Sequence, residues 1–212
     1  MKPLKLQLDG LKFQNNINVL ILSNIEIWNG LNKGLFSINP LLNKEDTSRP
    51  PYNTSSIDLR LGHEVFIPTG ELPFQFGLSK KGITKLLKDN SVRKELSEDQ
   101  SYTLKKNKLV LVSTLERVNF PINHDDIYYS ARVEGKSSIA RCGILIHFTA
   151  PTIHAGFEGV ITLEIINLGS NDFLLVKDMY ICQLIIEEVK GCPIQTPTQF
   201  VGQNTPVEIN SK

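Results

Sequence analysis

Residues 159–167, which read Gly-Val-Ile-Thr-Leu-Glu-Ile-Ile-Asn, decide the fold class. Ile161, Leu163 and Ile165 fall on one face of an extended strand, because successive side chains of a strand point to opposite faces. Glu164 falls on the other face. A carboxylate within an otherwise apolar strand is costly unless it is paired or faces a polar site. The sequence therefore predicts a strand, and Glu164 is either half of a structural ion pair or a general base.

Further segments on both sides have the same short, β-branched character and are separated by turn residues. Regular spacing of this kind predicts an antiparallel sandwich or barrel rather than alternating strands and helices. The predicted strands are 57–61, ending at Gly62, then 65–67, 108–113, 127–133, 144–149, 173–176 and 180–189.

Helices are predicted only in segments of the sequence outside these strands. Ser23 and Glu26 have the spacing of a capping box, and Gly34 supplies a C-terminal stop, so we expect a helix over about 24–33. One short surface helix is expected in the polar excursion 79–100.

The composition is that of a single globular domain. The chain has 212 residues, of which 41% are apolar and 21% charged, and its formal net charge is +1. This near-neutral balance argues against nucleic-acid or membrane binding by bulk charge, and no apolar run reaches the length of about 20 residues that spans a membrane. The first residues do not resemble a secretory signal, so we expect a cytoplasmic protein.

Gly-Lys-Ser-Ser at 135–138 places a cation and two hydroxyls at the start of a short predicted helical turn that ends at Gly143. Backbone N–H groups in such a place favour an anion, although a capped surface turn has the same composition. Arg141, within the same turn, is a candidate ion-pair partner for Glu164. Phosphate binding and a purely structural turn both remain open from the residues alone.

Five segments, taken in order, resemble the dCTP deaminases, the trimeric relatives of the dUTPases. The segment 134–143, Glu-Gly-Lys-Ser-Ser-Ile-Ala-Arg-Cys-Gly, is similar to the family's most diagnostic motif, with lysine where arginine is usual. The other four segments are 35–40, 53–62, 178–184 and 200–203.

This resemblance implies a mainly β, distorted barrel or jelly-roll-like fold of the dUTPase type. It also implies a homotrimer with active sites between subunits and hydrolytic deamination of dCTP to dUTP and ammonia, which feeds thymidylate supply. Residues 1–18 would be an extension of unknown role, 19–195 the deaminase-like domain, and 196–212 a mobile lid over the triphosphate.

Roles carry over by position under the same resemblance. Glu164 would be the general base, and Ser137 and Arg141 would hold the water and the pyrimidine C4 region. Mg²⁺ would bind with the triphosphate, without metal ligands from protein side chains. The expected substrate contacts are Lys136, Ser138, Ala150, His154, Phe157, Thr162, Leu163, Gln183, Gln199 and Gln203.

Zinc-dependent deaminases require an H-x-E motif with P-C-x-x-C to generate a metal-bound hydroxide. His63-Glu64 lacks the intervening residue, and Cys192-Pro193 has no second cysteine at the required spacing. A deaminase built from this sequence would use a carboxylate base and no zinc.

Besides Lys136, two further positions depart from the family. His154 stands where an aspartate usually contacts the sugar 3′-hydroxyl, and Gln199 stands where a lysine usually meets the triphosphate. The alternatives are a dUTP pyrophosphatase or a bifunctional deaminase–pyrophosphatase, for which the segment 152–156 lacks the expected aspartate. A nucleotide-binding homologue without catalysis is the third interpretation.

Overall fold

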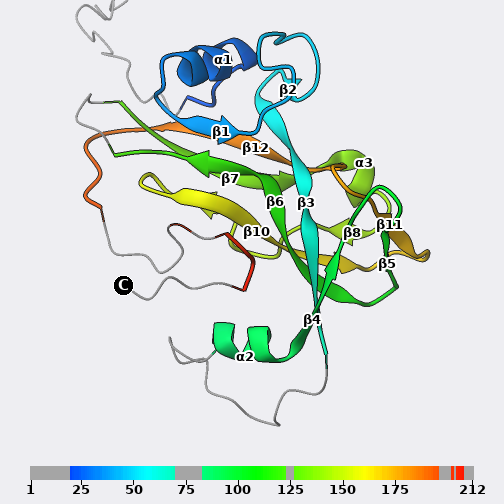
Figure 1. Cartoon of the computed structure of the whole chain (residues 1–212). Coiled ribbons are helices and arrows are strands. Elements are labelled where there is room, and N and C mark those ends of the chain that lie inside the picture. Colours follow the sequence, from blue (N-terminus) through cyan, green and yellow to red (C-terminus); the bar gives the residue numbers. More distant parts are fainter. Residues whose placement is uncertain (1–19, 70–82, 123–126, 196–201, 203, 208–212) are drawn as a thin grey trace, which may run out of the picture.

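The computed structural model describes residues 20–69, 83–122, 127–195, 202 and 204–207. Figure 1 shows a curled antiparallel sheet with α1 above it and α2 below it. The elements are α1 (Asn24–Asn32), β1 (Ser37–Asn39), β2 (Tyr52–Asn53), β3 (Ser56–Pro68), α2 (Ile83–Asp89), β4 (Ser91–Glu95), β5 (Tyr102–Leu104), β6 (Leu109–Asn119), β7 (Tyr128–Gly135), α3 (Ser137–Ala140), β8 (Ile144–Leu145), β9 (Thr152–Ile153), β10 (Glu158–Asn167), β11 (Phe173–Leu175) and β12 (Tyr180–Val189).

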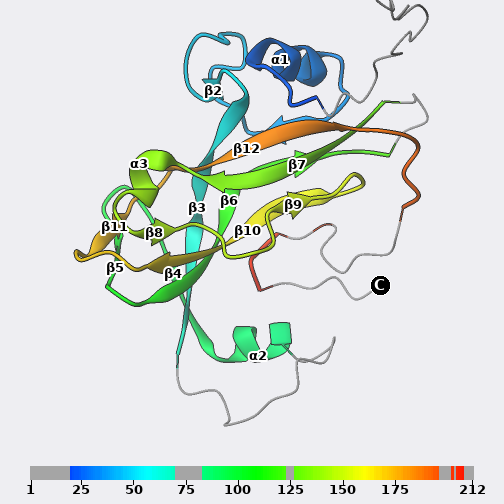
Figure 2. The same ribbon diagram turned by 180° about the vertical axis from the view of Figure 1, so that it is seen from behind.

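The main sheet runs in the order β8-β10-β6-β3-β12-β7-β9. β1 pairs with β6, β2 and β4 pair with β3, and β11 and β5 form a separate pair. Neighbouring strands are antiparallel in every one of these pairs among the described residues. The mainly β fold class is confirmed, and Figure 2 shows from behind how the sheet curls around its interior.

The alternation predicted for β10 is confirmed. Ile161, Leu163 and Ile165 are buried in the main core, whereas the intervening residues are half-buried. The same core contains the ring of Phe36, which lies 5.8 Å from the ring of Phe120 and 5.0 Å from that of Tyr129. One face of β10 is thus fixed by hydrophobic burial, which leaves its other face available for polar side chains.

The helix predicted over 24–33 is confirmed as α1. The Ser23 hydroxyl accepts a hydrogen bond from the backbone N–H of Glu26 at 3.3 Å. At the other end Gly34 has φ +70°, and the Leu35 N–H donates to the carbonyl of Gly30 at 2.9 Å. This is the left-handed helix ending that glycine permits without steric strain.

Three expectations for the strands were wrong or incomplete. The predicted strand was to end at Gly62, but β3 continues through it to Pro68. A Cβ at Gly62 would lie 2.8 Å from the carbonyl oxygen of Ser113, so glycine here permits close approach of β6 rather than a turn. The polar excursion 79–100 holds α2 as expected, but it also supplies β4, which pairs with β3. The strand predicted over 144–149 is reduced to the two residues of β8.

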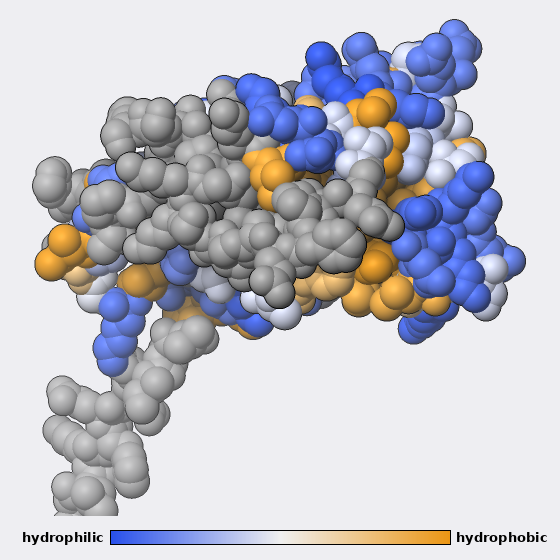
Figure 3. Space-filling model, turned by 90° about the horizontal axis from the view of Figure 1, so that it is seen from below, coloured by the Kyte–Doolittle hydropathy of each residue, from blue (hydrophilic) through white to orange (hydrophobic). Residues whose placement is uncertain are grey.

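Part of the C-terminal segment packs on the sheet of its own chain. The N–H of Gly202 donates to the carbonyl of Glu158 at 2.6 Å, and Arg117 donates to the side chain of Asn204 at 2.8 Å. Val207 is buried against Phe66 and Leu111. In the view from below, hydrophobic and hydrophilic residues are interspersed on the part of the surface that is coloured (Figure 3).

Candidate active site

The turn after β7 presents two hydroxyls and a guanidinium to solvent. Lys136 is the N-cap of α3, and its carbonyl accepts from the N–H groups of Ile139 and Ala140 at 3.0 and 2.9 Å. Ser137 and Ser138 begin the helix and Arg141 follows it, and all three are exposed. The helical turn predicted here is therefore confirmed, with its polar side chains free to meet a ligand.

Glu164 lies half-buried on the face of β10 that points away from the core. Its backbone neighbour in β6 is Leu111, which in turn stands opposite Phe66 in β3. Among the described residues the Glu164 carboxylate has no hydrogen-bond or ion-pair partner, and the ion pair with Arg141 that the sequence left open is not formed within this part of the chain.

The two parts of the predicted catalytic set lie on different sides of the sheet. Ile139 of α3 packs into the core that Leu163 and Ile165 also enter, so α3 sits on the inner side of β10. Glu164 projects from the opposite face. A single chain therefore does not bring Glu164 against Ser137 and Arg141 in this arrangement.

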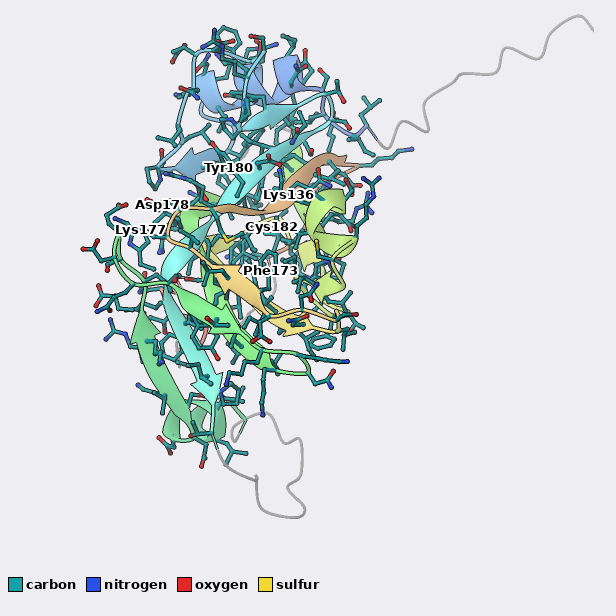
Figure 4. All side chains as sticks on the ribbon, turned by 90° about the vertical axis from the view of Figure 1, so that its right-hand side faces the viewer. Lys136, Phe173, Lys177, Asp178, Tyr180 and Cys182 are labelled. Carbon is teal, nitrogen blue, oxygen red and sulfur yellow. The ribbon has the colours of Figure 1, made fainter. Side chains whose placement is uncertain are left out.

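Lys136 and Gln183 are held by internal contacts. The Lys136 ammonium forms an ion pair with Asp58, which is only 5% exposed, and lies 5.8 Å from the ring centroid of Tyr180. The Gln183 carbonyl oxygen accepts from the Ser56 hydroxyl at 2.9 Å, and its amide N–H donates to the Gly135 carbonyl at 3.2 Å. Figure 4 shows Lys136 beside Tyr180 and Cys182 of β12.

The link between β9 and β10 carries His154 at its surface. The Phe157 N–H donates to the His154 carbonyl at 3.1 Å, and the Gly156 N–H donates to the Phe120 carbonyl at 2.6 Å. Phe157 packs its ring partly against the core, while His154 and Ala150 are exposed. These backbone hydrogen bonds hold the turn from His154 to Phe157, and the imidazole itself is exposed.

The remaining predicted substrate contacts differ in how far their side chains are buried. Thr162 is half-buried on the same face of β10 as Glu164. Leu163 is fully buried, which leaves its backbone rather than its side chain to contact a nucleotide. Gln199 and Gln203 lie outside the described residues.

A buried ion pair between Arg60 and Glu116 was missed by the sequence reasoning. The Glu116 carboxylate accepts from Arg60 Nε at 2.6 Å and from the Arg60 backbone N–H at 2.7 Å, and Arg60 also donates to the Pro40 carbonyl at 3.0 Å. Burial raises the pKa of Glu116, and the hydrogen bonds and charge of Arg60 oppose that shift. Burial likewise raises the pKa of the Cys182 thiol.

Neither a metal cluster nor a membrane helix is found in the described part of the chain. No group of three or more His, Cys, Asp or Glu side chains is placed there to hold a metal ion. None of the helices described is long and apolar enough to cross a membrane.

One curled antiparallel sheet, with a hydroxyl- and cation-bearing turn and a carboxylate on the other face of β10, places this chain in the class of mainly β proteins with polar groups around a single sheet. A family model described as dCTP deaminase-like matches residues 21–189, and the chain belongs to this family.

Curated relatives agree with this membership. A "dCTP deaminase, dUMP-forming" of Methanobrevibacter smithii is 34% identical over 87% of this chain and 88% of its own. A protein with the same name from Methanosphaera stadtmanae is 32% identical, over 88% and 91% of the two chains. A "dCTP deaminase" of Haloarcula marismortui is also 32% identical, over 88% and 92%.

A solved structure supports the fold. The 2′-deoxycytidine 5′-triphosphate deaminase of Agrobacterium tumefaciens matches with a TM-score of 0.57 and 20% identity. The match covers 79% of this chain and 48% of that one.

Proposed function

We propose that this protein catalyses the hydrolytic deamination of dCTP to dUTP and ammonia. The observation that carries the proposal is the Glu164 carboxylate, which is half-buried on an otherwise apolar strand and is not neutralised by any cation of the described residues. A carboxylate kept in this state is suited to accept a proton. Membership of the dCTP deaminase-like family supports the same assignment.

The reaction adds water to C4 of the cytosine ring and expels the amino group. Glu164 takes one proton from the attacking water as the C–O bond forms, which gives a tetrahedral centre at C4. The same carboxylate gives that proton to ring N3, then takes the remaining proton of the new C4 hydroxyl and passes it to the amino group, so that ammonia departs as the C–N bond breaks and C4=O forms. Ser137 would orient the water, and Arg141 would stabilise the ionised form of Glu164 and the C4 region.

We assign the active site to the boundary between copies of the chain in a homotrimer. Glu164 and α3 lie on different sides of β10, so a second copy is needed to bring Arg141 and Ser137 against Glu164. Exposed apolar side chains beside α3 support such a contact: Leu145 lies on the edge strand β8, and the N–H of exposed Leu168 donates to the Gly143 carbonyl.

Under this proposal, the metal ion would bind only together with the substrate. Mg²⁺ would accompany the triphosphate, where it neutralises phosphate charge, and zinc would have no part in generating the nucleophile. The chain's own contribution is then a carboxylate base, a hydroxyl and a guanidinium.

Formation of dUMP is a second candidate outcome. The related proteins from M. smithii and M. stadtmanae are both named "dCTP deaminase, dUMP-forming". The sequence of this chain places His154 and Gly156 in the segment where a pyrophosphatase aspartate was expected. The two outcomes differ in whether pyrophosphate is released together with ammonia.

The test measures ammonia and pyrophosphate separately after incubation of the pure protein with Mg²⁺ and dCTP, dUTP, dCMP or CTP. Ammonia alone from dCTP supports the deaminase, and equal amounts of ammonia and pyrophosphate support the dUMP-forming reaction. Pyrophosphate from dUTP without ammonia from dCTP identifies a pyrophosphatase, and nucleotide binding without either product overturns the enzyme assignment.

Glu164→Gln tests the assigned base. Glutamine is nearly isosteric but cannot take a proton, so turnover should fall by at least ~100-fold while the fold and assembly are kept. Glu188→Gln on β12, where the side chain is exposed, is the matched control and should retain turnover. Near-normal turnover in Glu164→Gln would show that another group is the base.

A further inference from the structure

We infer that Asp58 is a positioning residue for the active site, which acts by holding Lys136 at the start of α3. The inference rests on the proposed function and assigns Lys136 to this ion pair instead of to the phosphates of the nucleotide. Asp58 lies in β3, far from α3 in the sequence, and the strand order β3-β12-β7 brings the two together, since α3 follows β7 directly.

Both oxygens of the Asp58 carboxylate are used. One accepts from the Asn53 side-chain amide at 2.9 Å, and the other pairs with the Lys136 ammonium. A carboxylate that is 5% exposed requires a counter-charge, and Lys136 supplies it from a side chain that is itself mostly covered. The ring centroid of Tyr180 lies 5.8 Å from the same ammonium, within the range of a cation–π contact. Lys136 is therefore directed into the protein rather than towards the solvent.

The backbone of Lys136 links this ion pair to the proposed catalytic groups. Its carbonyl accepts the first two hydrogen bonds of α3, and no side chain caps the helix. The helix has only four residues, so its position depends both on the packing of Ile139 in the core and on how Lys136, its N-cap, is held. Ser137 follows Lys136 directly, and the Arg141 N–H donates to the Ser137 carbonyl at 3.1 Å.

A second tether acts one residue earlier. Gln183 of β12 stands between Asp58 of β3 and Glu134 of β7 in the strand register, so the three side chains lie in one row. Its amide joins the Ser56 hydroxyl to the Gly135 carbonyl. The ion pair and this hydrogen-bond chain together fix residues 135 and 136 against β3 and β12.

A positioning role and a phosphate-binding role for Lys136 predict different kinetics. If Lys136 positions the turn, Asp58→Asn and Lys136→Met should each lower kcat for dCTP by about 10-fold or more and change KM by less than about 3-fold. The double variant should be no worse than either single variant, because both changes break one interaction. Lys136→Arg should recover most of kcat, since arginine keeps the charge opposite Asp58.

Glu134→Gln is the matched control. The Glu134 side chain lies in the same row but makes only a 3.9 Å ion pair with Arg132. The kcat of Glu134→Gln should therefore stay within about 2-fold of that of the unmodified protein. A raised KM for dCTP in Lys136→Met, with unchanged kinetics in Asp58→Asn, would overturn the inference and return Lys136 to the phosphates. If Asp58→Asn does not fold, the contrast between Lys136→Arg and Lys136→Met decides by the same kcat and KM criteria.

Amide hydrogen exchange separates this inference from the proposed reaction. In the absence of nucleotide, the N–H groups of residues 139–143 should exchange faster in Asp58→Asn and Lys136→Met than in Glu134→Gln or the unmodified protein. Unchanged exchange in both variants would refute the positioning role whether or not dCTP is deaminated. Absence of ammonia release from the unmodified protein, by contrast, would refute the proposed function and leave the exchange result standing.

Discussion

Replacing Arg60 by methionine should destabilise this protein far more than replacing an exposed arginine. Glu116 is 1% exposed and Arg60 is 7% exposed, and the carboxylate accepts two hydrogen bonds from Arg60. Methionine keeps much of the volume and the backbone N–H donor but removes the charge. It therefore leaves a buried carboxylate without its counter-ion, a change that costs about 3–5 kcal/mol.

For a domain of this size each kcal/mol lowers Tm by about 2–4 °C, so Arg60→Met should unfold about 6–20 °C below the unmodified protein. The control is Arg93→Met, because Arg93 pairs with Glu64 at the surface and such pairs contribute about 0–1 kcal/mol. Thermal and denaturant unfolding at equal subunit concentration would measure both changes. Equal losses in the two variants would refute the argument.

The same variant should have a distinct pH dependence. Burial already raises the pKa of Glu116 above its reference value of 4.5, and loss of the Arg60 guanidinium removes the side-chain hydrogen bond and the charge that oppose this shift. An acid with a raised pKa in the folded state contributes stability that is complete below the unfolded pKa and is lost as pH rises through the folded pKa. The deficit of Arg60→Met should thus be greatest at pH 7–8 and narrow towards pH 5. Adding Glu116→Leu should recover most of the stability at pH 7, and a double variant weaker than Arg60→Met would contradict this account.

A zinc chelator should leave ammonia release from dCTP unchanged; loss of activity that zinc alone restores would contradict the carboxylate mechanism. His154→Asp should lower KM for dCTP more than KM for its 3′-deoxy analogue, because a carboxylate accepts the 3′-hydroxyl hydrogen bond, and equal effects on both would show that His154 does not contact the sugar. Val207→Asp places a charge against Phe66 and Leu111, so it should speed amide exchange at Gly202 and raise KM for dCTP, whereas Ile194→Asp, at a position that is 88% exposed, should do neither. Unchanged exchange at Gly202 in Val207→Asp would show that this packing does not hold the C-terminal segment.

The sequence predicted the strands best where one face is apolar and the other is polar. β10 is such a strand, and its alternation placed Ile161 and Glu164 on the correct faces. Residues 57–61 alternate in the same way, but their polar residues are not at the surface. Asp58 and Arg60 are buried, as is every residue of β3 from Ser56 to Gly62.

The partners of these buried charges could not be found from sequence spacing. Asp58 pairs with Lys136 and Arg60 with Glu116, across 78 and 56 residues of chain. Local periodicity carries no information on which distant strand becomes a neighbour, and only the assembled sheet order supplies it. A useful signal was present nevertheless: two opposite charges at alternate positions of a strand whose other side chains are apolar indicate a face that is covered and internally paired.

The alternation that makes β10 a core strand also determines where its chemistry occurs. Leu163 and Ile165 must enter the core to stabilise the sheet, so Glu164 between them must project from the other face. The turn with Ser137 and Arg141 is anchored on the inner side through Ile139, and its position follows from the same core. Folding of one chain therefore separates the proposed base from its proposed partners, and under the proposed function association of copies brings them together. Under the proposed function, a variant that blocks association without unfolding the chain should lose ammonia release even though every catalytic side chain is retained.

Mixing inactive Glu164→Gln subunits with inactive Arg141→Met subunits should restore part of the activity, since some boundaries in mixed assemblies combine an intact Glu164 with an intact Arg141. No recovery in assemblies shown to be mixed would place all the catalytic groups within one chain.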